Sequence, residues 1–171
     1  LKARLLDASG DTGSATELYQ LCANILSALD SDVIARDEQL SVMAAIATGA
    51  DWPDALSGSS LAGAVDGPML LTDPGSLTPA VATEIARLGA QDVYILGGYS
   101  AVSPTVEVQL EMLLDGFVWR IGGFDRYSTS RAVAYRTIEL LGPAYDGTIS
   151  VATGKDFPDA VAAAPLGAGL G

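Results

Sequence analysis

Short apolar runs that end in glycine or Thr-Gly alternate along the chain with longer segments of helical period. The short runs are typical of buried parallel strands, and the longer segments are typical of helices that cover a sheet. This alternation predicts an α/β fold with a mainly parallel sheet, flanking helices and short connections. The predicted strands are residues 43–47, 68–72, 92–96, 117–121 and 148–152. The predicted helices are residues 16–29, 53–64, 78–88, 104–114, 128–141 and 158–168.

One nine-residue segment occurs twice. When the chain is shifted by 105 residues, positions 47–55 and 152–160 are identical at seven of nine places. Self-similarity at a fixed spacing indicates a repeat architecture, so we predict tandem modules. We expect residues 1–114 to form a first module, whose N-terminal part is degenerate, and residues 115–171 to form a truncated second module.

Each copy of this segment holds two aspartates around an aromatic-proline pair: Asp51 and Asp54 in the first copy, Asp156 and Asp159 in the second. With the first aspartate as N-cap, the proline falls in the first helical turn and the second aspartate at N3, which is the spacing of a capping box. Alternatively, the pair binds a cation or acts in acid–base catalysis, which requires a carboxyl group with a raised pKa. Helix N-termini favour ionised carboxylates, so we interpret the motif as a helix cap.

The composition excludes several chemistries. A chain of 171 residues with 49% hydrophobic residues can bury a core, yet no apolar run reaches the roughly 18 residues of a membrane span. One cysteine and no histidine exclude an internal disulfide, His-ligated zinc and His-activated nucleophiles within this sequence. We therefore expect no catalytic residues, metal or cofactor. Because the chain lacks an initiator Met and a secretory pattern, we expect it to be a piece of a longer protein.

The charge is strongly acidic and unevenly distributed. The formal net charge of -12 argues against binding to nucleic acid or to anionic membranes. Residues 116–136, however, hold four arginines and one aspartate, a local balance of 4 - 1 = +3, so the other 150 residues carry -12 - 3 = -15. This arginine-rich segment is the best candidate for binding an anion.

Glycine pairs follow two predicted strands, at Gly97-Gly98 and Gly122-Gly123. Backbone N–H groups in such turns can hold a phosphate or a carboxylate, although neither copy completes a nucleotide-binding fingerprint. The simpler alternative is a tight turn that needs positive φ. Arginine suits bidentate capture of the same anions. The candidate ligand-binding residues are Arg120, Gly122, Gly123, Arg126, Tyr127 and Arg131.

Within this set, Tyr127 and Arg131 are four apart on the predicted helix and can stack as a cation–π pair or form a sugar-stacking surface. The alternative for the arginines is that Arg120 and Arg126 neutralise nearby aspartates between modules.

Three segments together resemble a known family. Residues 94–103 (Tyr-Ile-Leu-Gly-Gly-Tyr-Ser-Ala-Val-Ser), 120–129 (Arg-Ile-Gly-Gly-Phe-Asp-Arg-Tyr-Ser-Thr) and 151–160 (Val-Ala-Thr-Gly-Lys-Asp-Phe-Pro-Asp-Ala) resemble the second type of cell-wall-binding repeat of Gram-positive surface and secreted proteins. The resemblance covers roughly residues 43–171. Residues 1–42 match poorly and lack the family's Arg-Tyr pair.

The resemblance implies a non-enzymatic, extracellular anchor at the cell wall, built from Rossmann-like or flavodoxin-like α/β modules. Tandem modules of this family, usually three, are expected to bind an anionic secondary wall polymer of teichoic-acid type non-covalently. The expected partners are that polymer and further copies of the repeat in the full-length chain. Because a partial repeat exposes module interfaces, we also expect the fragment to self-associate as a homo-oligomer.

Two other hypotheses stay open. An α/β enzyme on phosphorylated or sugar substrates would use the repeated aspartates as acid, base or Mg²⁺ ligands at the strand ends, and predicts that the four carboxylates converge in one cleft. A structural repeat of a surface-layer (S-layer) lattice would instead bury Arg120 and Arg126 in ion pairs with no open face.

Overall fold

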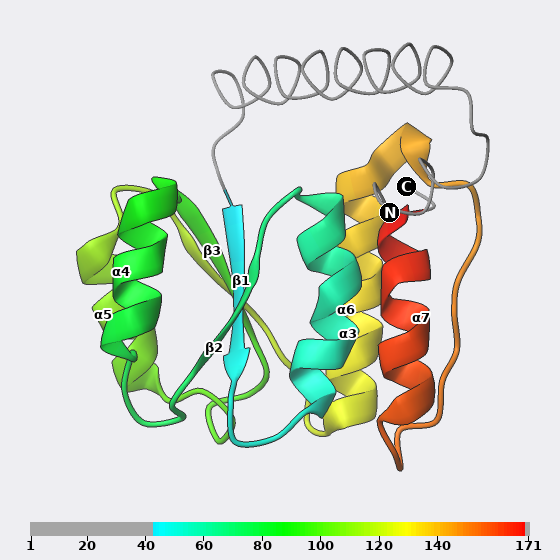
Figure 1. Cartoon of the computed structure of the whole chain (residues 1–171), viewed down its shortest axis with the longest axis horizontal. Coiled ribbons are helices and arrows are strands. Elements are labelled where there is room, and N and C mark those ends of the chain that lie inside the picture. The colour runs from blue at the N-terminus through cyan, green and yellow to red at the C-terminus, as the bar shows by residue number, and fades with distance from the viewer. Residues whose placement is uncertain (1–42, 170–171) are drawn as a thin grey trace, which may run out of the picture. The chain divides into compact units, whose positions relative to one another are not determined.

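A computed structural model describes residues 43–169 of the chain, and these belong to one compact unit. Their sheet has four parallel strands in the order β2-β1-β3-β4 (Figure 1). The strands are β1 (Met43–Thr48), β2 (Met69–Thr72), β3 (Asp92–Leu96) and β4 (Val118–Ile121). This is the α/β fold with a parallel sheet that the sequence predicted, and each of these strands lies within one residue of its predicted bounds. The predicted helix at 16–29 lies outside the described residues.

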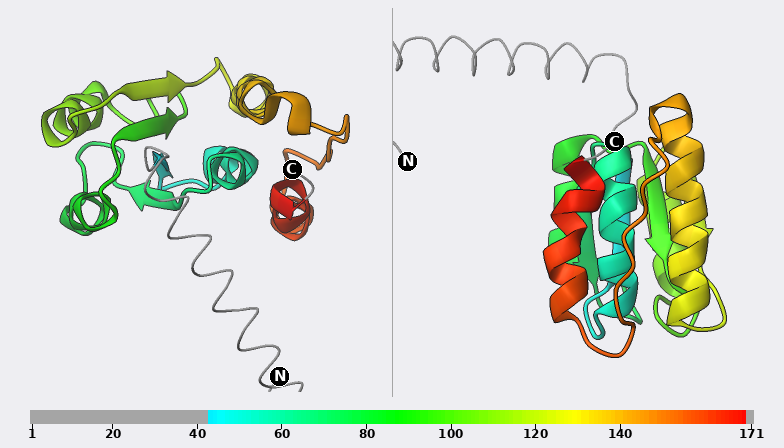
Figure 2. Two further views of the ribbon diagram at one scale, coloured as in Figure 1. Left: turned by 90° about the horizontal axis from the view of Figure 1, so that it is seen from above. Right: turned by 90° about the vertical axis from the view of Figure 1, so that its right-hand side faces the viewer.

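Helices cover both faces of the sheet (Figures 1 and 2). The bounds are α3 (Pro53–Ala64), α4 (Pro79–Leu88), α5 (Pro104–Leu113), α6 (Arg126–Leu141), the 3₁₀ turn η1 (Gly142–Ala144) and α7 (Pro158–Gly169). Helices α4 and α5 pack on one face through Val81, Ile85, Val106 and Leu110. Helices α3 and α6 pack on the other face through Leu61 and Val133, and α7 lies alongside α3.

Both faces of the central strands are buried, which explains their continuous apolar runs. In β1, alternate residues go to the two cores: Ala44 and Ile46 face α4 and α5, and Ala45 and Ala47 face α3 and α6. A parallel sheet covered by helices on both sides requires this pattern. Gly58 lets α3 approach the sheet closely, because a Cβ at this position would collide with the Leu96 side chain of β3.

The helices begin where proline or a cap allows. Proline occupies the first helical position of α3, α4, α5 and α7. An N–H at this position has no acceptor within the helix, so its absence in proline costs no hydrogen bond. Helix α6 starts instead at a capping box, in which the Ser128 amide donates to Asp125 and the Asp125 amide donates to the Ser128 hydroxyl. Gly89 ends α4 in the left-handed conformation that glycine adopts without cost.

The capping box predicted at Asp51 is wrong. Helix α3 begins one residue later than that prediction requires, with Trp52 as its N-cap and Pro53 as its first helical residue, so Asp54 is the second helical residue. The Asp51 carboxylate accepts a hydrogen bond from the Trp52 amide at 2.9 Å, and no side chain caps the helix.

The predicted strand at 148–152 is also wrong: these residues have no regular secondary structure, and Ile149 and Val151 are 67% and 88% exposed. The equivalent strand β1 is held between β2 and β3, both of which follow it in the sequence. Among residues 43–169 no strand lies beside this segment to pair with its backbone groups, and its β propensity alone does not form a strand.

The module boundary predicted between residues 114 and 115 stays a prediction about the repeat. The sheet itself crosses that point, because β4 pairs with β3 from Val93–Val118 to Leu96–Ile121. In residues 43–169, no helix is long and apolar enough to cross a membrane.

Candidate functional site

The two glycine turns pack against each other at the carboxyl ends of β3 and β4. The Gly97 amide donates to the Ile121 carbonyl at 2.8 Å, and a Cβ added to Gly122 would lie 2.7 Å from the Gly97 carbonyl oxygen. Gly97 has φ +103°, and its missing side chain leaves room for the Asp54 carboxylate. The positive φ expected for these turns is therefore found at Gly97, whereas Gly122 is needed for close approach of two backbones.

Arg120 lies in a largely buried network. Its Nη2 and Nε atoms donate to one carboxylate oxygen of Glu107 at 2.9 and 3.1 Å, and Nη1 donates to the Gly97 carbonyl at 3.0 Å. The guanidinium also stacks over the Tyr99 ring, 4.5 Å from its centroid. Only 12% of the Arg120 side chain is exposed. These contacts hold α5, the Gly97 turn and β4 together and leave little of the charge facing solvent.

Arg126 joins the two copies of the repeated segment. Its Nη1 donates to the Gly154 carbonyl at 3.2 Å, its Nη2 lies 3.7 Å from Asp51, and its guanidinium stacks over Trp52 at 5.2 Å from the ring centroid. Gly154 belongs to the second copy, and Asp51 and Trp52 belong to the first. The side chain remains 38% exposed, so part of its hydrogen-bonding capacity faces outward.

The two copies share one local structure as well as one sequence. In each, the threonine hydroxyl accepts from the amide two residues later, at 3.1 Å for Thr48 and 3.3 Å for Thr153. The first aspartate of each copy accepts from the following aromatic residue's amide at 2.9 Å. The copies lie side by side, since Trp52 and Phe157 meet edge to face with centroids 6.2 Å apart. The motif therefore folds locally in the second copy, although the strand before it does not form.

Tyr127 and Arg131 do not stack as proposed from their spacing. In the described part of the chain, cation–π contacts join Arg120 to Tyr99, Arg126 to Trp52 and Arg136 to Tyr94. Tyr127 packs instead against Gly154, where a side chain would collide with its ring, and is 57% exposed. Arg131 is exposed one turn further along α6, and among residues 43–169 it forms no ion pair.

The Gly123 amide is occupied, because it donates to the Thr129 hydroxyl at 3.0 Å. The adjacent Asp125 carboxylate accepts from the Ser128 amide and hydroxyl at 2.8 and 2.7 Å. These hydrogen bonds lower the pKa of Asp125, and the charge of Arg131 adds to the effect. The glycine turn is thus held by its own helix.

A crevice lies beside this turn, where the carboxyl ends of the strands meet. The order in which strands are added to the sheet reverses between β1 and β3, since β2 lies on one side of β1 and β3 on the other, and open α/β sheets bind ligands at such a point. This strand-end crevice has a volume of about 300 Å³, and its charged lining residues are Asp51, Asp54, Asp125 and Arg126. Their balance is 1 - 3 = -2, which disfavours an anion. Burial raises the pKa of Asp54, the charge of Asp51 raises it further, and Arg126 opposes the shift.

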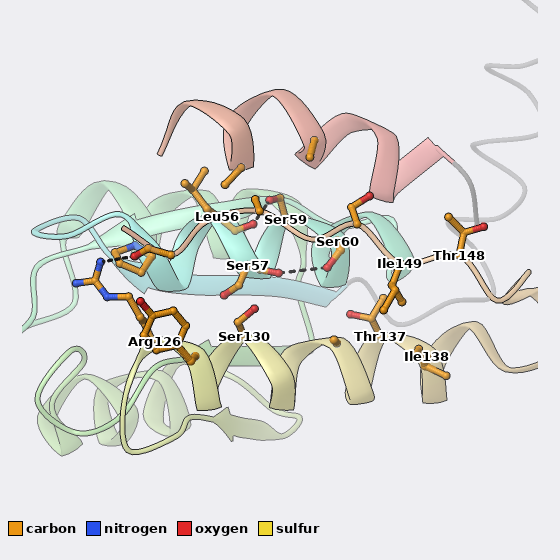
Figure 3. A pocket seen from close by; sticks show the side chains of 18 of the residues that line it. Leu56, Ser57, Ser59, Ser60, Arg126, Ser130, Thr137, Ile138, Thr148 and Ile149 are labelled. Atoms are coloured by element: carbon orange, nitrogen blue, oxygen red, sulfur yellow. Dashed lines mark hydrogen bonds between the residues drawn. The ribbon is translucent and has the colours of Figure 1, made fainter. Parts of the chain in front are cut away.

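A second cavity lies on the helical side, between α3, α6, α7 and residues 145–154 (Figure 3). We call it the helix groove. Its volume is about 270 Å³, and its charged lining residues are Arg126 and Asp146, a balance of zero. Arg126 and Pro53 line both cavities, so Arg126 separates the acidic crevice from the neutral groove.

The four repeated aspartates do not converge. Asp51 and Asp54 line the strand-end crevice, whereas Asp156 and Asp159 line neither cavity. Among the residues that the structure describes, no group of three or more His, Cys, Asp or Glu side chains is arranged to hold a metal ion. The convergence required by the enzyme hypothesis is absent from this part of the chain.

Sequence reasoning missed the partners of the arginines. Glu107, Tyr99 and Trp52 decide what Arg120 and Arg126 do, yet none of them is near its arginine in sequence. The apolar-polar pattern places Glu107 on a helix, but only the crossover from β3 to β4 brings α5 beside β4. For Trp52, the signal in the sequence was its place in the repeated segment, directly after the first aspartate.

The geometry defines a class of protein: an α/β module with a repeated turn motif, an arginine that joins the copies, and cavities on both sides of that arginine. Residues 15–107 and 120–171 match the family Cell wall binding domain 2 (CWB2), and the chain belongs to this family. The resemblance seen in the sequence is thereby confirmed, but the expectation that residues 1–42 match poorly is wrong for residues 15–42, which belong to the first matched range. The family is one of cell-wall binding domains, which places the protein at the cell surface.

Similar proteins agree with this assignment. The chain is 37% identical over 118 residues to the amidase enhancer of Bacillus subtilis (strain 168), covering 69% of this chain and 16% of that protein. It is 33% identical over 91 residues to the N-acetylmuramoyl-L-alanine amidase LytC of the same organism, covering 53% and 18%.

Among solved structures, Cwp6 and Cwp8 from Clostridium difficile are similar at TM-scores of 0.56 and 0.54, each at 29% identity. They cover 60% and 57% of this chain and 16% and 17% of those chains. The chain thus spans about one sixth of the length of its relatives.

Proposed function

We propose that this chain is a non-catalytic anchor that binds an anionic secondary polymer of the cell wall, of teichoic-acid type, through the outward-facing part of Arg126. The observation that carries the proposal is the position of Arg126, which lies between the two copies of the repeated motif of a cell-wall-binding family with 38% of its side chain exposed. Arginine suits the phosphate or carboxylate groups of such a polymer because its fork of N–H donors can bind two oxygens at once.

The charges around Arg126 decide which side the polymer approaches. The strand-end crevice carries -2 and repels an anion, whereas the helix groove is neutral apart from Arg126 and Asp146. Tyr127 of α6 lines the groove and offers an exposed ring there, whereas Arg131 is exposed on α6 and is not part of the groove lining. We assign the polymer to this side.

The remaining candidate residues position Arg126 and do not themselves contact the polymer in this proposal. The Arg120 guanidinium donates hydrogen bonds to Glu107 and to the Gly97 carbonyl. Gly122 and Gly123 form the turn before α6, the helix that begins at Arg126. Their role in this proposal is positioning. The relatives named as an amidase and an amidase enhancer suggest that the full-length protein pairs the anchor with an effector domain, and that further copies of the repeat complete it.

The test is a pull-down with purified walls that have been boiled in detergent and treated with protease. Arg126→Ala should weaken binding about tenfold, as expected for losing one charge-assisted hydrogen-bonding group. Binding by the parent should fall with added salt, because exposed charges are screened over about 10 Å at 0.1 M. Walls stripped of their anionic polymer should bind neither the parent nor Arg126→Ala.

Two matched variants separate polymer binding from the clamp between repeats. Asp51→Asn removes the ion pair to Arg126 but keeps the arginine, so wall binding should be retained or strengthened. Arg87→Ala removes an exposed arginine on α4, at the opposite face of the sheet, and should leave binding unchanged. If Asp51→Asn weakened binding as much as Arg126→Ala, Arg126 would act only as a clamp and the assignment would fail.

A further inference from the structure

The helix groove has an unusual lining for a space between helices. It is bordered by hydroxyl side chains from three parts of the chain, with the Trp52 and Tyr127 rings at the end next to Arg126 and Tyr145 beyond the other end of α6. The hydroxyl residues are Ser57, Ser59, Ser60, Ser130, Thr137, Thr148, Ser150 and Thr153, and the aromatic ones are Trp52, Tyr127 and Tyr145. In Figure 3, Ser57 of α3 and Ser130 of α6 point toward one another, with Arg126 at one end and Ile138 at the other.

The serines of α3 present acceptors to the groove. Ser57 and Ser60 donate their hydroxyl protons to backbone carbonyls three residues earlier, at 3.1 and 3.2 Å, and Ser59 does the same to Leu56. Thr137 on α6 likewise donates to the Val133 carbonyl at 2.9 Å. Each oxygen keeps a lone pair for a donor from outside the helix. Apolar side chains complete the lining, among them Leu56, Ala134, Ile138 and Ile149. A ligand that matches both parts brings hydroxyl donors together with C–H surface, as a sugar does.

The charge and the length of the groove further restrict the kind of ligand that fits it. Between Arg126 and Ile138, the groove-facing residues of α6 are uncharged, so this stretch suits a neutral ligand segment. Twelve residues of helix span about 18 Å at 1.5 Å per residue, which is long enough for several sugar rings in a row. Aromatic rings beside Arg126 offer apolar faces to the C–H groups of a sugar while their polar edges stay solvated.

We infer that the helix groove binds a neutral, polyhydroxylated sugar segment of the wall polymer, oriented so that a neighbouring anionic group lies on Arg126. This inference rests on the proposed function and extends it, because it assigns the polymer's uncharged portion to residues that the charge argument does not involve. In this arrangement, hydrogen bonds to the hydroxyl side chains of the groove determine which glycan is bound, and the charge of Arg126 determines how the affinity depends on salt.

Two substitutions at Ser130 test the groove directly. Ser130 is exposed and faces the groove, so Ser130→Leu blocks the space without disturbing the core, and Ser130→Ala removes only the hydroxyl. Thr83→Leu is the matched control, since Thr83 is an exposed hydroxyl residue on α4, on the other face of the sheet. Thermal unfolding of each variant verifies that it is folded.

The readout is affinity for detergent-boiled, protease-treated walls at two salt concentrations. Ser130→Leu should weaken binding about tenfold with the salt dependence of the parent, whereas Arg126→Ala should weaken binding and flatten that dependence. If Ser130→Leu bound these walls as tightly as Thr83→Leu, the inference would be overturned and the anchor function would stand. An effect confined to walls that still carry their proteins would mean a protein occupant and would also overturn it. Failure of the parent to bind walls would instead overturn the proposed function, and the inference with it.

Discussion

The most informative single perturbation is Arg120→Ala, because the sequence and the structure give this residue different roles. From the sequence, Arg120 is a ligand-binding arginine. In the structure, its guanidinium contacts Glu107, the Gly97 carbonyl and the Tyr99 ring, with 12% of the side chain exposed. The variant should therefore lose stability, while the wall affinity of the protein that remains folded should stay close to that of the parent.

The contacts set the size of the effect. Breaking a buried ion pair by removing one partner costs about 3–5 kcal/mol, and the 12% and 22% exposure of Arg120 and Glu107 reduces this to about 2–3 kcal/mol. The hydrogen bond to the Gly97 carbonyl and the stacking on Tyr99 bring the total to about 3–4 kcal/mol, since these contributions are not additive. In a domain of this size such a loss lowers Tm by roughly 10 °C.

A double-mutant cycle isolates the pair. Thermal and urea unfolding of Arg120→Ala, Glu107→Gln and the double variant should give a coupling free energy of about 2 kcal/mol. Wall affinity is measured on the same samples at a temperature where all are folded. A Tm for Arg120→Ala within about 2 °C of the parent would refute the argument from burial. A tenfold loss of wall affinity at unchanged Tm would show that Arg120 binds the ligand, as the sequence predicted.

Three further predictions concern stability near the site. Gly97→Ala should destabilise the protein by about 3 kcal/mol in urea unfolding, because φ is +103° and the new Cβ would meet Ala101 at 2.9 Å, whereas the control Gly89→Ala, with φ +64° and open space, should cost about 1 kcal/mol. Asp125→Ala should lower Tm at neutral pH. Since hydrogen bonds lower the pKa of Asp125, this stabilisation is lost as the pH falls below about 4, where parent and variant should converge in Tm. Asp54→Asn should stabilise the protein near pH 7, because burial raises the pKa of Asp54 and its ionisation opposes folding as the pH rises above about 4; equal Tm values at pH 7 would contradict this.

The sequence by itself determined the α/β class, four strands within one residue, the starts of most described helices and the family. Buried strands and covering helices leave periodic signals in local sequence, and a repeated segment such as Thr-Gly-x-Asp-x-Pro-Asp folds through contacts between near neighbours. The start of α3 shows the limit of such reasoning: Trp52 is its N-cap, the Asp51 carboxylate accepts from the Trp52 amide, and the capping box that the spacing predicted does not form.

Only the tertiary structure decided what the candidate residues do. Arg120 is held by Glu107 from another helix, and Arg126 lies between segments about 100 residues apart in sequence. Residues 148–152 have the composition of a strand but no neighbouring strand among the described residues. The partner of a charge and the partner of a strand are both long-range contacts, and spacing along one chain does not encode which distant segment will supply them.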